Sequence, residues 1–286
     1  MSSTSSVVHT PGTTRLRLLV WPREHGAWGL LFVPLVTGAW LGHPSAQTIV
    51  PVMLFALAAL GLFCLRTPVE VWLHLSAMRA QNAAERAVVL ASIVICLGVS
   101  GTALIFLIGW QRAHGLLLLG AAAAAAFLAQ AALKSLGRET RMNAQLTGAL
   151  ALTSTAAGAY YLASGNLGRM ALIAWAVNWL FAANQIHYVQ LRIHTARLTL
   201  PAERFTAAQG FLLGEALTGL LLGSAWRAGW LPGLALLAFI PALVRGVVWI
   251  FRQPQRLQVH RLGMSELTQA VLFGLALITA FQLRGV

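Results

Sequence analysis

Basic residues gather in alternate gaps between the apolar runs of this chain. Fifteen of the 20 lysines and arginines occupy five such gaps, three to a gap. The five groups are Arg15, Arg17 and Arg23; Arg66, Arg79 and Arg86; Lys134, Arg138 and Arg141; Arg192, Arg197 and Arg204; and Arg252, Arg256 and Arg261. The positive-inside rule produces this alternation in a polytopic membrane protein. It predicts that these five groups face the cytoplasm.

The composition excludes a soluble protein. Hydrophobic residues make up 58% of the chain and charged residues 9%, whereas soluble domains carry about 25% charged residues. The net charge of +13 does not indicate nucleic-acid binding, because the basic residues lie in short loops rather than on one soluble face. The expected partners are the lipid bilayer and anionic lipids at its cytoplasmic face.

Nine segments are long and apolar enough to cross a bilayer as helices. They are approximately 26–42, 48–66, 87–109, 114–132, 144–163, 167–188, 208–226, 229–251 and 266–283. The predicted fold is therefore an all-α, nine-helix membrane bundle forming one transmembrane domain over 21–286. An odd number of spans places the two termini on opposite faces, and the arginine groups predict the N-terminus in the cytoplasm and the C-terminus outside. The Ser/Thr-rich residues 1–20 are predicted to be a disordered cytoplasmic tail.

Two long cytoplasmic loops resemble each other at an offset of 118 residues. Arg79 aligns with Arg197, and Ala84-Glu85-Arg86 aligns with Ala202-Glu203-Arg204. The same offset superposes spans 2 to 5 on spans 6 to 9. This pattern predicts a parallel four-helix repeat, 48–163 and 166–283, behind an added first span. Repeats of this kind place binding sites at their interface in transporters.

The string Trp21-Pro22-Arg23-Glu24-His25-Gly26-Ala27-Trp28 resembles the start of the YwiC-like family of bacterial membrane proteins. The nine spans, with long loops after spans 2 and 6, resemble the topology of the UbiA prenyltransferase superfamily. The first resemblance implies a bacterial inner-membrane protein. The second implies a UbiA-like bundle that binds a prenyl diphosphate and transfers its prenyl group. It also implies Mg²⁺, held in those loops by Asp-rich motifs.

The acidic residues depart from that superfamily pattern. All seven are glutamates, and the chain contains no aspartate. Magnesium prefers hard oxygen ligands, usually including carboxylates, and the second loop offers only Glu203. No cofactor and no catalytic residue is therefore evident from the residues themselves. Arginine can still hold an anion directly through paired hydrogen bonds.

Twelve residues at the cytoplasmic ends of the spans are candidates for substrate binding. They are Arg23, Glu24, His25, Glu70, His74, Arg79, Asn184, Gln185, His187, Tyr188, Arg192 and Arg197. At the start of span 1, His25 either cradles an anion or is an interfacial anchor. Glu70 and His74 are four residues apart and would share one helix face, as a metal pair, a proton relay or a solvated loop helix.

The remaining candidates allow similar alternatives. The Asn184 to Arg192 cluster either lines a cavity or is solvated because the span ends near Asn184. Arg79 and Arg197 either converge on an acidic head group or only set topology and attract anionic lipid. That second role is expected for Arg86, Arg204, Arg256 and Arg261.

Two ionisable residues lie within predicted spans. Glu215 and Arg245 would each be about 10 Å from the cytoplasmic end of their helix, so the sequence predicts that they form an ion pair. Such a pair is either functional or structural, and Arg245 could instead extend to the interface.

Two function classes follow. One is a prenyltransferase-related protein that binds an isoprenoid, a quinone or another anionic amphiphile near the cytoplasmic face. The alternative is a small-ion or metabolite transporter, or an accessory membrane protein without catalysis. The loop positions favour the first class, and the repeat and Glu215 favour the second.

Overall fold

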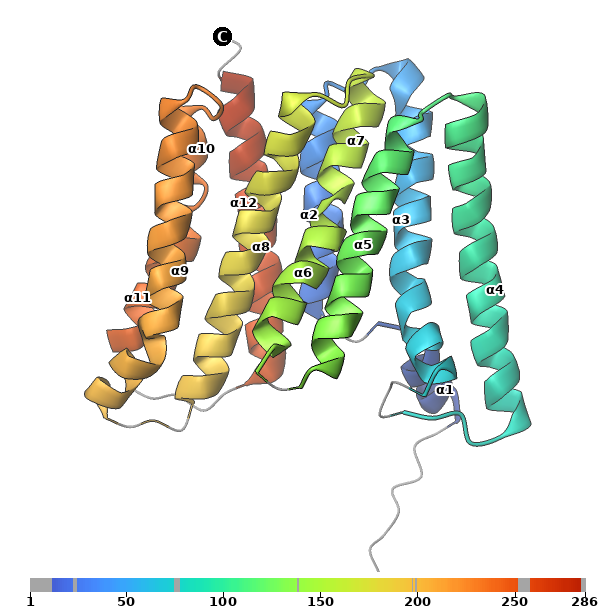
Figure 1. The fold of residues 1–286 in the computed structure, drawn as a ribbon, viewed down its shortest axis with the longest axis horizontal. Helices are drawn as coiled ribbons and strands as arrows, with labels where there is room; N and C mark the ends of the chain where they lie inside the picture. The colour runs from blue at the N-terminus through green and yellow to red at the C-terminus, as the bar shows by residue number, and fades with distance from the viewer. Residues whose placement is uncertain are drawn as a thin grey trace, which may run out of the picture. The chain divides into compact units, whose positions relative to one another are not determined.

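The computed structural model describes residues 12–22, 25–74, 78–137, 139–196, 198, 200–251 and 258–283. Regular structure across these residues is helical, which confirms the predicted all-α class. The elements are α1 (Gly12–Val20), α2 (His25–Leu41), α3 (Ala46–Trp72), α4 (Ala83–Ile105), the π turn η1 (Phe106–Trp110), α5 (Gly115–Ser135), α6 (Arg141–Thr153), α7 (Thr155–Ser164), α8 (Arg169–Thr195), α9 (Pro201–Arg227), α10 (Gly233–Leu237), α11 (Ile240–Phe251) and α12 (Val259–Gln282) (Figure 1).

Within the described residues, six helices are long and apolar enough to cross a membrane. They are Ala46–Trp72, Ala83–Trp110, Gly115–Ser135, Ala202–Arg227, Gly233–Phe251 and His260–Gln282. The chain is therefore a multi-pass membrane protein. The other three predicted spans coincide with α2, with α6 and α7 together, and with α8. Because α2 has 17 residues, α6 and α7 are separate and α8 is rich in polar side chains, the count of nine spans stays a prediction.

The chain divides into two compact units. One comprises Met1–Arg23 and Ala56–Phe106, and the other comprises Glu24–Phe55 and Leu107–Val286. The chain passes from one unit to the other before α2, inside α3 and inside η1. The predicted four-helix repeat is not tested by this division and stays a prediction.

In the first unit, α1 packs through its apolar face. Leu19 is fully buried and forms a small core with Val71 and Val89. Leu16 and Val20, at helical spacing from Leu19, pack against the same core. The prediction of a disordered tail is therefore wrong for residues 12–20, because the leucines of this segment pack against a hydrophobic core. Residues 1–11 lie outside the described part of the chain.

In the second unit, three phenylalanines join α8, the α10–α11 connection and α12. Phe181 and Phe273 stack with ring centroids 3.9 Å apart, and Phe239 meets Phe273 edge to face at 5.0 Å. Such aromatic pairs add about 0.5–1.5 kcal/mol beyond the area they bury. This core fixes α8 and α12 next to each other.

Small residues bring α2 against α7. A Cβ added at Gly38 would collide with the backbone of Ala156, and one at Gly42 would lie 2.6 Å from the Cβ of Ala163. Glycines four residues apart allow such close helix contact inside membranes. Gly38 and Gly42 therefore determine how closely these two helices approach.

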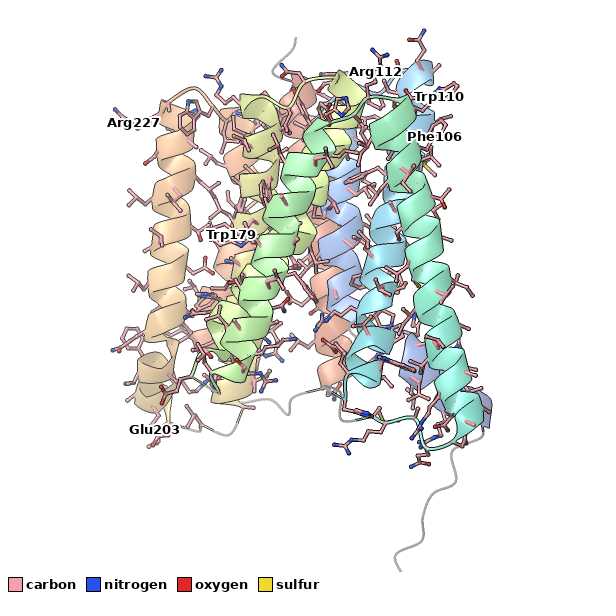
Figure 2. The ribbon with its side chains drawn as sticks, turned by 45° about the vertical axis from the view of Figure 1, so that its right-hand side comes forward. Phe106, Trp110, Arg112, Trp179, Glu203 and Arg227 are labelled. Atoms are coloured by element: carbon pink, nitrogen blue, oxygen red, sulfur yellow. The ribbon has the colours of Figure 1, made fainter. Side chains whose placement is uncertain are left out.

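Polar side chains fix α8 against its neighbours in the second unit. The indole Nε1 of Trp179 (Figure 2) donates to the carbonyl of Leu146 in α6 at 3.1 Å. The amide of Asn178 donates to Thr37 Oγ1 in α2 at 3.0 Å. These bonds are valuable in an apolar surrounding, where the groups would otherwise go unpaired. They set the rotation of α8 and so the direction in which its last three turns face.

Candidate functional site

The predicted polar cluster lies inside α8, because the helix continues to Thr195. Asn184, Gln185 and Tyr188 are buried, and His187 and Arg192 are partly buried. The helix therefore continues past Asn184, and Gln185 and Tyr188 are buried rather than solvated. Buried polar groups in a membrane helix need partners from neighbouring helices.

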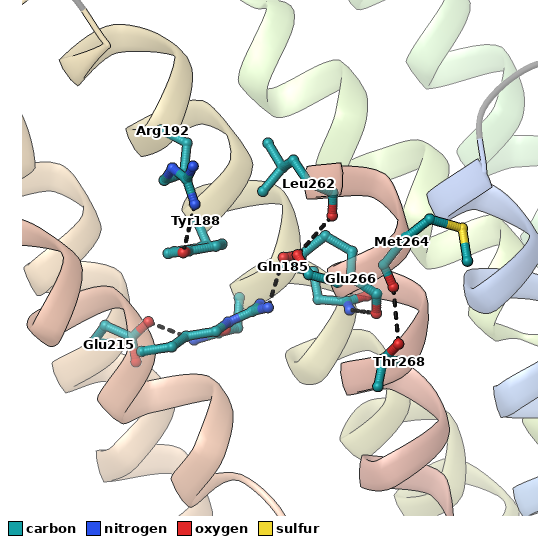
Figure 3. Close-up of polar contacts among 11 residues, drawn as sticks. Gln185, Tyr188, Arg192, Glu215, Leu262, Met264, Glu266 and Thr268 are labelled. Carbon is teal, nitrogen blue, oxygen red and sulfur yellow. Dashed lines mark hydrogen bonds and ion pairs between the residues drawn. The ribbon is translucent and has the colours of Figure 1, made fainter. Parts of the chain in front are cut away.

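Two glutamates on other helices contact this cluster. Asn184 Nδ2 donates to Glu215 Oε1 of α9 at 2.5 Å. Gln185 Nε2 donates to the backbone carbonyl of Glu266 in α12 at 2.7 Å. Figure 3 shows Glu215 and Glu266 on separate helices, with Gln185 and Tyr188 of α8 near them. The cluster therefore joins three helices that are distant in sequence.

Arg245 contacts a different carboxylate from the predicted one. Its Nη1 lies 2.6 Å from Glu266 Oε1, in a pair whose side chains are 14% and 5% exposed. The prediction placed Glu215 too near its helix end, because α9 begins at Pro201. At about 1.5 Å per residue, Glu215 is about 21 Å from the start of α9. Arg245 is close enough to interact with Glu215 electrostatically, but its direct ion pair is with Glu266. The direct Glu215–Arg245 ion pair is therefore corrected to Arg245–Glu266.

Arginine guanidinium groups lie over aromatic rings on the next turn of the cluster. Arg192 lies 3.7 Å from the centroid of the Trp249 ring and donates to the Tyr188 hydroxyl at 3.1 Å. Arg245 lies 4.3 Å from the Tyr188 centroid. Cation–π contacts of this kind are worth about 2 kcal/mol when they are shielded from water. These contacts hold the guanidinium groups of Arg192 and Arg245 between α8 and α11.

These residues line an open groove between α8 and α11, here called the α8–α11 groove, with a volume of about 350 Å³. Its lining residues are Tyr188, Arg192, Ile240, Pro241, Val244, Arg245, Val248 and Trp249. Ile240, Val244 and Val248 recur every four residues, so they form one stripe along α11. This stripe is exposed, and in a membrane protein it faces lipid. The groove thus combines a cationic wall with an apolar edge.

Arg204, for which the sequence predicted only a role in topology, is 3% exposed. Its Nη2 donates to the backbone carbonyl of Trp249 at 2.7 Å. Trp249 lies in the last turn of α11, where helix carbonyls lack partners within the helix. Arg204 is thus part of the structure behind the groove. The sequence drew attention to Arg204 only through its alignment with Arg86, and that alignment predicted an exposed residue rather than a buried one.

His187 faces α9 rather than the groove. Its Nδ1 lies 2.7 Å from the position that a Cβ would take at Gly214. Gly214 therefore makes room for the imidazole beside Glu215. Gly246 of α11 likewise leaves room for the Phe211 ring of α9.

Several buried polar atoms of the cluster have no hydrogen-bond partner within the described part of the chain. They are Asn184 Oδ1, Arg192 Nε, Glu215 Oε2, Arg245 Nε and Nη2, and Glu266 Oε2. Buried polar groups are normally paired. Their concentration in one cluster calls for a partner such as water, an ion or a ligand, or for a functional role of these groups.

Comparison with protein families finds a match in the N-terminal part of the chain. Residues 21–161 match the family described as YwiC-like protein. The chain carries a YwiC-like region. The match begins at Trp21, the first residue of the string that predicted this resemblance. Searches of curated proteins and of solved structures return no match, so the resemblance to the UbiA superfamily stays a prediction.

The YwiC-like region contains the candidates of the first loop, and the structure separates them. Glu70 pairs with Arg66 one turn earlier, with Nε 3.1 Å from Oε1. α3 ends at Trp72, and His74 is exposed with a φ of 59°. The expectation that Glu70 and His74 share a helix face is therefore wrong. Arg79 is exposed, and its carbonyl accepts a hydrogen bond from Arg15 at 3.3 Å.

Other candidates lie outside the described residues. These are Arg23, Glu24 and the side chain of His25 at the start of the YwiC-like region, and Arg197 in the second loop. The anion site at His25 and the convergence of Arg79 with Arg197 therefore stay predictions.

The donor set of the described residues does not fit the Mg²⁺ site that the UbiA resemblance implies. Glu70 is engaged by Arg66, and Glu266 by Arg245. The α8 positions supply the amides of Asn184 and Gln185 rather than carboxylates. Magnesium prefers an octahedron of hard oxygens, and no group of three His, Cys, Asp or Glu side chains gathers among the residues that the structure describes.

Proposed function

We propose that this integral membrane protein binds an anionic amphiphile in the α8–α11 groove, with the head group on Arg192 and the apolar tail along α11. A prenyl phosphate and an acidic phospholipid both have this chemistry. The five basic groups of the sequence favour a groove whose head-group end faces the cytoplasm. The proposal includes binding and assigns no catalytic step.

Arg192 carries the proposal. Its hydrogen bond goes to a neutral phenol and its face covers a neutral indole. No carboxylate in the described part of the chain accepts a hydrogen bond from it, and its Nε is buried without a partner. Glu266 is close enough to interact electrostatically with Arg192, but its carboxylate is paired with Arg245. Two guanidinium groups thus share one carboxylate, which favours an anion as a further partner of Arg192. Arg192 is three residues from the end of α8, at the level expected for a lipid head group.

The exposed apolar stripe on α11 indicates where the apolar tail of the proposed ligand binds. Val248, Val244 and Ile240 lead from the Arg192 end of the groove toward the middle of the membrane. Eight residues of helix span about 12 Å, so the stripe offers an apolar track of that length. A lipid-open track accepts a long chain whose far end stays in the bilayer. An isoprenoid or acyl tail fits this requirement, whereas a small hydrophilic metabolite leaves the track unused.

Lipid analysis of the purified protein tests the proposal. The protein is isolated in mild detergent and its bound lipids are quantified by mass spectrometry. We expect about one acidic amphiphile per chain and a loss of about tenfold or more in Arg192→Gln, since one charged hydrogen bond is worth about 1.5–3 kcal/mol. Val244→Trp fills the groove without changing charge and is expected to give a similar loss.

The matched control is Arg227→Gln, an exposed arginine at the end of α9 opposite Glu203 (Figure 2). This variant is expected to keep the bound lipid. Wild-type protein without a bound acidic amphiphile would contradict the proposal. Lipid-free protein together with Glu215-dependent ion flux in proteoliposomes would instead favour the transporter class.

A further inference from the structure

A second site lies deeper in the same unit, between α8 and α9. Asn184 and Glu215 form it, and neither residue lines the α8–α11 groove. Asn184 is 4% exposed. Glu215 lies 14 residues from the start of a 27-residue helix that is apolar enough to span the membrane. A carboxyl group at such depth is costly when ionised and is usually functional.

The hydrogen bonding of these two side chains is half complete. The Asn184 amide nitrogen donates to Glu215 Oε1. The second oxygen of each side chain, Asn184 Oδ1 and Glu215 Oε2, is buried without a partner. Both oxygens are acceptors when the carboxyl group is ionised, so they cannot satisfy each other. A proton on Oε2 makes that oxygen a donor, and Asn184 Oδ1 is the acceptor on the group already bonded to it.

We propose that Glu215 is a proton-binding site, with the proton on Oε2 donated to Asn184 Oδ1. The acid and the amide then form a two-bond cyclic pair. One proton binds and no covalent bond breaks. This pairing satisfies two of the buried atoms that otherwise lack partners, within a single pair of side chains.

The surrounding charges agree with a neutral Glu215. On α11, Arg245 is close enough to Glu215 to interact electrostatically, but its Nη1 is engaged by Glu266 of α12. On α8, His187 lies beside Gly214, the residue before Glu215, and Arg192 lies in the groove. With Glu266 ionised, Arg245 already has its counter-charge. A protonated Glu215 therefore leaves no uncompensated negative charge at mid-membrane.

Infrared spectroscopy of the full-length protein in lipid tests this proposal. At neutral pH we expect the carbonyl band of a protonated carboxyl group, and its loss in Glu215→Gln. Glu203→Gln changes an exposed glutamate near the start of the same helix and is expected to leave the band unchanged. A wild-type spectrum that lacks this band at neutral pH overturns the proposal, as does a band that persists in Glu215→Gln.

Two further variants provide an independent measurement. Glutamine preserves both hydrogen bonds of the neutral acid, so Glu215→Gln is expected to change the unfolding equilibrium constant by less than about threefold. Asn184→Leu removes both bonds and is expected to change it by tenfold or more. Equal, large losses in the two variants contradict a protonated Glu215, because they indicate that the charge of Glu215 contributes to stability. These measurements do not depend on whether the groove binds lipid.

Discussion

The tripeptide Ala-Glu-Arg begins two helices of this protein, and the structure buries a different charge each time. At the start of α4, Glu85 is 7% exposed while Arg86 is exposed. At the start of α9, Glu203 is exposed while Arg204 is 3% exposed. Identical short sequences therefore take opposite roles, and the neighbouring helix decides which.

The partners explain the difference. In the first unit, α1 supplies Arg15, whose Nε lies 2.6 Å from Glu85 Oε1, and the backbone N–H of Gln81 donates to Glu85 Oε2 at 2.7 Å. In the second unit, α11 ends next to α9 and offers the carbonyl of Trp249 to Arg204. A buried charge persists only where such a partner exists. The first loop thus stabilises a helix start, and the second supports the groove.

The largest predicted loss of stability follows from breaking the buried Arg245–Glu266 ion pair of the second unit. Breaking the partly exposed Arg66–Glu70 pair of the first unit is expected to cost much less. Arg245→Gln leaves Glu266 buried without its counter-ion and is expected to cost about 3–5 kcal/mol. Arg66→Gln is expected to cost about 1 kcal/mol or less, because Arg66 and Glu70 are 27% and 33% exposed. Denaturant unfolding in detergent measures both. Adding Glu266→Gln to Arg245→Gln should recover part of the loss, and equal costs for the two arginines would refute the contrast.

The next effect separates the two arginines of the repeated tripeptide. Arg204→Gln removes a buried charged hydrogen bond and is expected to destabilise the protein by about 2 kcal/mol. Arg86→Gln changes an exposed side chain and is expected to stay within about 0.5 kcal/mol of wild type. The same unfolding measurement tests the pair. If Arg86→Gln proves the more damaging, the buried role assigned to Arg204 is wrong.

For the glutamates of the repeated tripeptide, the substitution in the first unit is expected to destabilise the protein more than the one in the second unit. Glu85→Gln weakens the ion pair with Arg15 and is expected to cost about 1 kcal/mol at low ionic strength. Glu203→Gln is expected to change stability by no more than about 0.5 kcal/mol. Raising the salt concentration should shrink the Glu85→Gln effect, because salt screens a pair that is partly exposed. A salt-independent effect would mean that the ion pair is not its source.

The smallest effect concerns the residue before each tripeptide helix. Asn82 caps α4 by accepting the backbone N–H of Glu85 at 2.8 Å, whereas Leu200 occupies that position before α9 and is 58% exposed. Leu200→Asn is expected to stabilise the protein by about 0.5 kcal/mol by adding a cap. Leu200→Ala is the control, since it removes the same side chain without adding an acceptor. A gain shared by both variants would rule out capping as the cause.

Several features of the site could be predicted from sequence because they depend on local composition. The polar run from Asn184 to Arg192 stood out against an apolar span, and Glu215 and Arg245 stood out as ionisable residues within spans. Their partners could not be predicted in the same way. The register between α9, α11 and α12 depends on where each helix begins, and the start of α9 at Pro201 lies seven residues before the expected one. That shift changes the distance of Glu215 from its helix end, and Arg245 pairs directly with Glu266 while it interacts with Glu215 only electrostatically.

The α1 helix and Arg204 show the same limit. The segment around Leu19 resembled a tail because its own sequence does not show the core, formed with Val71 and Val89, that covers it. Arg204 resembled a surface residue because the end of α11 that binds it is 45 residues away. In both cases the stabilising partner is distant in the chain.

The sequence by itself determined the class of this protein. Its apolar runs, its scarcity of charge and its alternating arginine groups require a helical membrane protein, because a bilayer leaves no other way to satisfy the backbone of such segments. The first residues of the YwiC-like region also determined the family resemblance. Only the tertiary structure decided which carboxylate pairs with Arg245, which arginine of the repeated tripeptide is buried, and that Arg192 lines an open groove beside α11. Those outcomes depend on helix starts and rotations, which are set by packing between distant segments rather than by local sequence.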